Sequence, residues 1–152
     1  MRFWDSSALL PLFVQEATSG AVADAYELDA DVIAWWATQV ECASTLARLE
    51  RDGRLSGPAL TAALGRVARF AAAWHEVQPL PVIRQTAVRL LRVHDLRAAD
   101  ALQLAAALTA SEGQPDSLPF VTLDARLAAA ADREGFGIVR LREVPAGGNE
   151  VT

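Results

Sequence analysis

The sequence contains no lysine: all 14 of its basic residues are arginine. A phosphate-binding P-loop needs a lysine at the phosphates, and Schiff-base chemistry needs a lysine amine. Haloacid-dehalogenase phosphatases and response-regulator receivers also pair their aspartates with a lysine. The composition therefore excludes these classes of α/β protein.

Cysteine is nearly absent as well, since Cys42 is the only one in the chain. A single cysteine excludes an internal disulfide framework and a zinc site built from cysteines. No apolar run approaches the roughly 20 residues that a membrane span needs, and the first residues lack the regions of a signal peptide. We therefore expect a cytoplasmic protein with no membrane contact.

The remaining composition is typical of a globular protein, with 52% hydrophobic and 22% charged residues. We place one domain at residues 1–142 and expect a flexible tail over 143–152, where Pro145, Gly147 and Gly148 interrupt the pattern. The formal net charge is −5. Arginines are nevertheless concentrated over residues 60–97, where they could form a local phosphate-contacting patch.

Short apolar runs alternate with helical patterns along the chain. We expect strands near residues 1–4, 31–34, 77–80, 119–122 and 137–141, and helices over 8–14, 18–28, 38–52, 57–75, 81–93, 98–110 and 125–134. Strands of this length between helices predict a mainly parallel sheet covered by helices on both faces. The expected fold class is therefore α/β.

One predicted helix is apolar almost all round and carries a carboxylate in its first turn. Over residues 98–110 only Asp100, Gln103 and Thr109 are polar, which predicts a buried helix. A carboxylate there is costly unless positive charge or several donors meet it. The helix N-terminus, with its free N–H groups and dipole, is one explanation. A metal ion shared with other carboxylates is another.

Four acids stand at the starts of predicted helices: Asp5, Glu41, Asp100 and Asp124. Because ligands bind at the carboxyl ends of parallel strands, these side chains could converge. Each also has a simpler explanation, with Asp5 and Asp124 as helix caps and Glu41 as half of a capping box with Thr38. Capping alone would require four helices to use a carboxylate where Ser, Thr or Asn would serve as well. A cluster of oxygen ligands instead suits Mg²⁺ or Mn²⁺.

The motifs around these acids resemble those of PIN-domain ribonucleases, most of all the VapC-type toxins of bacterial toxin–antitoxin pairs. The resemblance extends from Met1 to about Leu141. Four motifs in order carry it, and together they make it specific: Phe3-Trp4-Asp5-Ser6-Ser7-Ala8-Leu9-Leu10, Val40-Glu41-Cys42-Ala43-Ser44, Leu96-Arg97-Ala98-Ala99-Asp100-Ala101-Leu102-Gln103-Leu104-Ala105 and Val121-Thr122-Leu123-Asp124.

The resemblance implies a PIN-like three-layer α/β/α fold and a metal-dependent endoribonuclease. One or two Mg²⁺ ions, with Mn²⁺ as a substitute, would serve hydrolysis of RNA phosphodiesters by the toxin of a type II module. The residues implied are the metal-binding and catalytic acids Asp5, Glu41, Asp100 and Asp124, the supporting Ser6 and Thr122, and the candidate substrate contacts Arg97 and Gln103, the latter at a position where relatives often carry His or Tyr.

The resemblance also implies partners. These are an RNA substrate, a small VapB-type antitoxin whose basic segment enters the acidic groove, a second copy in a homodimer, and DNA only through the antitoxin. An acidic N-terminal half suits a basic antitoxin segment electrostatically. The RNA target stays open among tRNA, ribosomal RNA and mRNA.

Other functions remain as alternatives. A non-catalytic PIN-like module could bind RNA or a protein through the same groove. A metal-free ribonuclease would use His75 and His94, which lie in predicted helices without an evident orienting partner. A DNA-directed nuclease such as a flap endonuclease would be longer and carry more acids. Trp35 and Trp36 are expected in a core or interface, with stacking on a base as the alternative.

Overall fold

The computed structural model describes residues 1–141, so Arg142 and the predicted tail over 143–152 lie outside the described residues. Four short strands form one sheet: β1 (Arg2–Trp4), β2 (Val32–Trp35), β3 (His75–Val77) and β4 (Phe120–Val121). Their order is β3-β2-β1-β4, and each pair of neighbours is parallel. The predicted α/β class with a short-stranded parallel sheet is confirmed.

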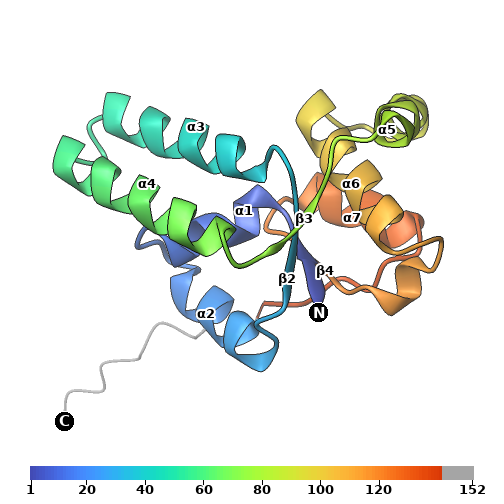
Figure 1. The fold of residues 1–152 in the computed structure, drawn as a ribbon, viewed down its shortest axis with the longest axis horizontal. Coiled ribbons are helices and arrows are strands. Elements are labelled where there is room, and N and C mark those ends of the chain that lie inside the picture. The colour runs from blue at the N-terminus through green and yellow to red at the C-terminus, as the bar shows by residue number, and fades with distance from the viewer. Residues whose placement is uncertain (142–152) are drawn as a thin grey trace, which may run out of the picture.

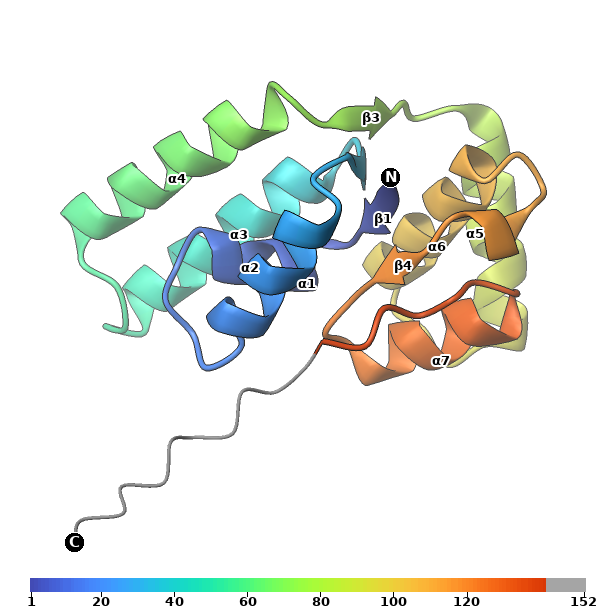
Figure 2. The ribbon, with the colours of Figure 1, turned by 90° about the horizontal axis from the view of Figure 1, so that it is seen from below.

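The α-helices of the described chain cover this sheet in two layers. Both views show α1 to α4 on one face and α5 to α7 on the other (Figure 1, Figure 2). Their bounds are α1 (Ser6–Leu9), α2 (Ser19–Leu28), α3 (Thr38–Arg51), α4 (Gly57–Ala71), α5 (Pro81–Val93), α6 (Ala98–Ala110) and α7 (Ala125–Arg133). Within residues 1–141, no helix combines the length and apolar character needed to cross a bilayer.

Alternating strand residues supply two separate cores, because successive side chains of a strand point to opposite faces. On β2, Ile33 and Trp35 pack with the α5 to α7 layer, whereas Val32 and Ala34 pack with the α1 to α4 layer. The α6 helix is buried against the first core, as predicted from its nearly continuous apolar sequence. Its first turn is thereby fixed close to the sheet.

Several helix ends follow from local sequence chemistry. Asp5, Ser56 and Asp124 occupy the N-terminal caps of α1, α4 and α7, where a side-chain oxygen of each accepts a hydrogen bond from a first-turn N–H. Gly53 follows α3 with φ of +70°, a conformation that favours glycine and stops the helix. Two of the four predicted acids are therefore helix caps.

The predicted capping box at the start of α3 is wrong. Ala37 occupies the cap position, and Thr38 is already the first helical residue. The Thr38 hydroxyl accepts a hydrogen bond of 3.0 Å from the side-chain amide of Gln103 on α6. A tertiary contact therefore uses the side chain that the local pattern assigned to the backbone.

Some predicted bounds also differ from the structure. Helix α4 ends at Ala71 rather than near residue 75, and β3 spans residues 75–77 rather than 77–80. His75 and Glu76 are polar and exposed on this edge strand, so no apolar run in the sequence marks it as a strand. Over the described residues 137–141, Ile138 makes only a single bridge to Phe120, so the predicted last strand is not formed there.

Candidate metal site

The carboxyl ends of all four strands lie at one edge of the sheet because the strands are parallel. Asp5 directly follows β1, and Asp124 lies shortly after the neighbouring strand β4. The chain order reverses between these two strands, and such a switch point forms a ligand-binding crevice in open parallel sheets. Glu41 and Asp100 lie in the first turns of α3 and α6, which belong to opposite helical layers.

Asp5 is the most deeply buried of the four predicted acids, with 3% of its surface exposed. Its Oδ1 accepts hydrogen bonds from the Ser7 hydroxyl at 2.7 Å and from the Ala8 N–H at 3.2 Å. Burial nevertheless raises the pKa of Asp5 to about 7, and the charge of Glu41 adds to that shift. A carboxyl group in this environment favours a positively charged ligand.

Glu41 is held by donors from two other helices. Its Oε2 accepts hydrogen bonds from Ser6 Oγ at 2.8 Å and from Gln103 Nε2 at 2.9 Å. Burial raises the pKa of Glu41, and the charge of Asp100 raises it further, although both hydrogen bonds act in the opposite direction. Ser6 therefore contacts a predicted acid, and its supporting role in catalysis stays a prediction.

Gln103 is almost completely buried, although it is one of the predicted substrate contacts. Its Nε2 donates to both Glu41 and Thr38, and its Oε1 is buried without a hydrogen-bond partner within residues 1–141. A contact between Gln103 and substrate stays a prediction. The contacts present in the structure are those of a residue that orients Glu41.

Asp100 is partly buried in the first turn of α6, next to the buried part of that helix. Burial raises the pKa of Asp100, and the charge of Asp124 raises it further. The charges of Arg97 and Arg126 lower that pKa, so both guanidinium groups lie within electrostatic reach of the carboxylate. The acidic site is therefore flanked by two cations.

Asp124 caps α7 with one oxygen. Its Oδ1 accepts hydrogen bonds from the N–H groups of Arg126 at 2.8 Å and Leu127 at 2.9 Å. The cap formed by Asp5 likewise uses Oδ1. Helix capping therefore explains where both residues stand, but it does not exclude a metal as a second partner of either carboxylate.

Ser7 connects the two strand ends that carry these caps. Its hydroxyl donates to Asp5, lies 3.3 Å from Thr122 Oγ1, and accepts a hydrogen bond of 2.9 Å from the Leu123 N–H. Thr122 Oγ1 in turn accepts a hydrogen bond of 3.0 Å from the Asp124 N–H. The Ser7 and Thr122 hydroxyls thus link the β1 end to the β4 end.

The four carboxylates form one electrostatically coupled set. Three of the charges raise the pKa of another member: Glu41 acts on Asp5, Asp100 on Glu41, and Asp124 on Asp100. In residues 1–141, no three His, Cys, Asp or Glu side chains are grouped closely enough to hold a metal ion as they stand. The donor chemistry nonetheless fits a hard, hydrated cation, and the open acceptor Oε1 of Gln103 suits a water carried by such an ion.

Comparisons with known proteins match the fold but not the sequence. No family model and no curated protein matches the chain. A toxin–antitoxin complex from Klebsiella pneumoniae aligns with a TM-score of 0.65 and 17% identity over 95% of this chain and all of its own. FitAcB from Neisseria gonorrhoeae aligns with a TM-score of 0.65 and 17% identity over 92% of this chain and 97% of its own.

A third structure, PAE2754 from Pyrobaculum aerophilum, aligns with a TM-score of 0.60 and 23% identity over 90% of this chain and 81% of its own. The fold is PIN-like. Alignment along almost the whole chain confirms the predicted three-layer architecture, and it supports the stated resemblance at the level of the fold.

Three residues of this candidate site were not predicted from the sequence. Ser7 lies inside a predicted motif, but only the structure pairs it with Leu123. Thr38 was assigned to a local cap, whereas it contacts α6. Arg126 lies two residues after Asp124, and this short spacing is the sequence signal that could have placed it beside the site.

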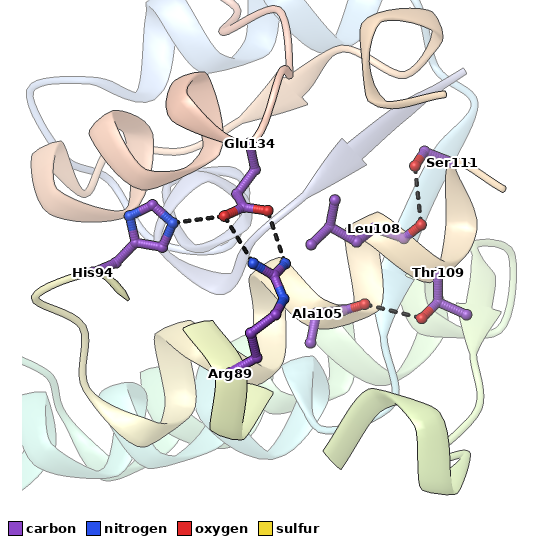
Figure 3. A network of polar contacts seen from close by, with 7 residues as sticks. All are labelled: Arg89, His94, Ala105, Leu108, Thr109, Ser111 and Glu134. Atoms are coloured by element: carbon purple, nitrogen blue, oxygen red, sulfur yellow. Dashed lines mark hydrogen bonds and ion pairs between the residues drawn. The ribbon is translucent and has the colours of Figure 1, made fainter. Parts of the chain in front are cut away.

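Both histidines of the PIN-like chain lie outside the helices. His75 is exposed on β3, and His94 follows the last residue of α5. His94 Nε2 lies 2.7 Å from Glu134 Oε1, and the other carboxylate oxygen accepts a hydrogen bond of 2.8 Å from Arg89, as Figure 3 shows. The expectation that His94 has no orienting partner is therefore wrong. Glu134 approaches from the end of α7, which the local sequence of His94 does not reveal.

Proposed function

We propose that the chain is a Mg²⁺- or Mn²⁺-dependent endoribonuclease that acts as the toxin of a type II toxin–antitoxin module. The observation that carries this proposal is the coupled set of four carboxylates at the carboxyl edge of a PIN-like parallel sheet. Helix capping accounts for Asp5 and Asp124 only. Glu41 and Asp100 are not caps, and only the weaker attraction of a helix N-terminus accounts for them, whereas one shared cation accounts for all four.

In this proposal Asp5 and Asp100 bind the metal directly, and Glu41 and Asp124 bind it, bind its water or orient the attacking water. When bound, Mg²⁺ activates a water and stabilises the charge that develops on the phosphate. The protein contributes orientation. Ser7 holds the Asp5 carboxylate, while Ser6 and Gln103 together hold that of Glu41.

The acidic site must also accept a polyanion. Arg97 and Arg126 are exposed and lie within electrostatic reach of Asp100. Arginine presents several donors in a planar fork that matches phosphate oxygens. We assign these two residues to the phosphates that flank the scissile bond, and Arg126 extends the contact predicted for Arg97.

The toxin assignment rests on the PIN-like fold and on two neighbours of that fold. One of them is described as a toxin–antitoxin complex, and FitAcB aligns equally well. An acidic site suits a basic segment of a small antitoxin, which would shield the carboxylates and block RNA. In this proposal the protein is a homodimer and reaches DNA only through the antitoxin.

The decisive experiment is cleavage of end-labelled total tRNA and ribosomal RNA by the purified chain. Reactions contain Mg²⁺, Mn²⁺ or EDTA and compare wild type with Asp100→Asn. Asp116→Asn provides a matched control, because Asp116 is an exposed acid in the short turn before β4. We expect discrete cuts that depend on metal, survive Asp116→Asn and vanish with Asp100→Asn.

Each other outcome has a defined meaning. Cleavage that survives both EDTA and Asp100→Asn would contradict the metal mechanism and favour the histidines. If folded protein without antitoxin does not cleave RNA, the proposed ribonuclease activity is contradicted. A non-catalytic module that binds RNA or a protein is then favoured. The cut positions would identify the RNA target.

A further inference from the structure

Trp36 is the tryptophan that the fold leaves at the surface. Trp4, Trp35 and Trp74 are buried, whereas 49% of Trp36 is exposed. Burying a tryptophan removes a large apolar area from water, so a ring left exposed on a well-packed element is a candidate contact for another molecule. The position of Trp36 in the fold indicates what kind of molecule this ring contacts.

Trp36 directly follows β2 at the carboxyl edge of the sheet, the edge that carries the acidic site. Its backbone N–H donates a hydrogen bond of 3.1 Å to the Val77 carbonyl at the end of the adjacent strand. Its ring lies edge-on against the buried Trp35, with centroids 6.5 Å apart and planes at 68°. The ring is therefore held on a rigid support.

The same segment leads directly into the site. Thr38, two residues on, accepts a hydrogen bond from Gln103, and Gln103 also binds Glu41 in the first turn of α3. Trp36 thus begins a short connection that ends on a predicted acid. An RNA strand with a phosphate at the acids would bring its neighbouring nucleotides over this connection.

Charge gives a reason for a stacking contact at this place. The chain has a net charge of −5 and the site itself carries four acids, so long-range electrostatics oppose the approach of an RNA backbone. Stacking of a base on an aromatic face does not depend on charge and accepts any unpaired base. Val40 and Leu80, in the segments that follow Trp36 and β3, are exposed as well, so a protein interface is the competing explanation that the test must separate.

We propose that Trp36 is a stacking platform for an unpaired nucleobase next to the phosphate held at the acidic site. The inference rests on the proposed ribonuclease function and narrows its substrate to RNA that is single-stranded at the cut. Trp36 then contributes to substrate affinity and not to metal binding. Trp36→Ala should therefore weaken RNA binding and leave Mn²⁺ affinity unchanged.

The test measures binding of fluorescein-labelled RNA by anisotropy, with Ca²⁺ in place of Mg²⁺ and RNA integrity checked on a gel. The probes are a single strand of alternating A and C and the same strand paired with its complement. We compare wild type, Trp36→Ala, Trp36→Phe and Leu28→Ala. Leu28 is the matched control, since it is an exposed apolar residue at the end of α2.

We expect Trp36→Ala to weaken single-strand binding by about tenfold, the loss of one stacking contact. Trp36→Phe should retain most of the affinity, because it keeps an aromatic face. Binding of the paired probe and the behaviour of Leu28→Ala should match wild type. RNA should also quench the tryptophan fluorescence of wild type, and this quenching should be lost in Trp36→Phe.

Two results would overturn the inference while the proposed function survives. One is metal-dependent cleavage with single-strand affinity that is equal in wild type and Trp36→Ala. The other is a change in oligomeric state on light scattering with unchanged RNA affinity, which would assign Trp36 to a protein interface. If wild type neither cleaves nor binds RNA, the proposed function fails and the inference fails with it.

Discussion

The side-chain amide of Gln103 on α6 donates a hydrogen bond of 2.9 Å to the carboxylate of Glu41 on α3. The same nitrogen lies 3.0 Å from the Thr38 hydroxyl, one turn earlier on α3. Two helices from opposite layers are therefore joined beside the acidic site by one buried amide. This link orients Glu41 and lowers its pKa against the effect of burial.

Gln103→Leu removes this link at nearly constant volume. The Thr38 hydroxyl and one side of Glu41 lose their donor, so we expect the free energy of unfolding to fall by about 1–2 kcal/mol. The pKa of Glu41 should rise further, as followed by NMR titration. Thr109→Val is the control, because it removes a hydrogen bond within α6 itself. Equal urea midpoints for wild type and Gln103→Leu would show that the link does not stabilise the fold.

Asp124→Ser separates helix capping from metal binding. A serine side chain caps a helix about as well as aspartate, so the stability of α7 should change by less than about 1 kcal/mol. The variant nevertheless lacks a carboxylate, and we expect it to lose metal-dependent cleavage. Thermal unfolding and the RNA cleavage assay measure the two effects. Full cleavage activity in a stable Asp124→Ser protein would limit Asp124 to its capping role.

Asp5 makes the metal-free protein less stable as the pH rises. Its pKa is about 7 in the folded chain, against 3.8 for an exposed aspartate carboxyl group. The folded state therefore keeps this proton between about pH 4 and pH 7 while the unfolded state loses it, and the free energy of unfolding falls across that range. Asp5→Asn removes the titrating group.

We therefore expect Asp5→Asn to gain stability relative to wild type between about pH 4 and pH 8, by up to about 4 kcal/mol for a shift of this size. Urea unfolding in EDTA at several pH values measures the difference. Glu41 and Asp100 remain in both proteins, so their contributions largely cancel. Parallel pH profiles for the two proteins would mean that Asp5 is already ionised in the folded state.

Metal binding should release protons and weaken in acid. Burial raises the pKa of Asp5, Glu41 and Asp100, and a metal requires their ionised forms. Below about pH 7 we expect Mn²⁺ affinity to fall roughly tenfold per pH unit for each proton displaced. Calorimetry in two buffers of different ionisation enthalpy gives the number of protons. An affinity that is flat from pH 5 to pH 8 would contradict this coupling.

His94 is expected to be structural. Its contact with Glu134 joins the end of α5 to the end of α7, so His94→Ala should lower the free energy of unfolding by about 1–2 kcal/mol. His75 is exposed, and His75→Ala should change stability little. Both variants should still cleave RNA. Loss of cleavage in a folded histidine variant would support the metal-free mechanism.

Local patterns were sufficient for most of the fold. The bounds of α2, α5 and α6 follow from apolar periodicity and the first-turn proline of α5, and Asp124 was predicted as a cap. The predictions that failed concern the first helix, which spans Ser6–Leu9 rather than 8–14, the cap of α3, the position of β3 and the last strand. Thr38 bonds to another helix, β3 is a polar edge strand, and Ile138 makes a single bridge. Each of these depends on partners distant in the chain.

The sequence by itself determined which residues are available for chemistry: an arginine-only set of cations, and four acids at the starts of helices. These properties are local and are visible in composition and spacing. Only the tertiary structure decided that Asp5 is buried, that Trp36 is exposed while Trp35 is not, and that Gln103 bonds to Glu41 across 62 residues. Burial and pKa depend on all the atoms around a group, and those atoms come together only when the chain folds.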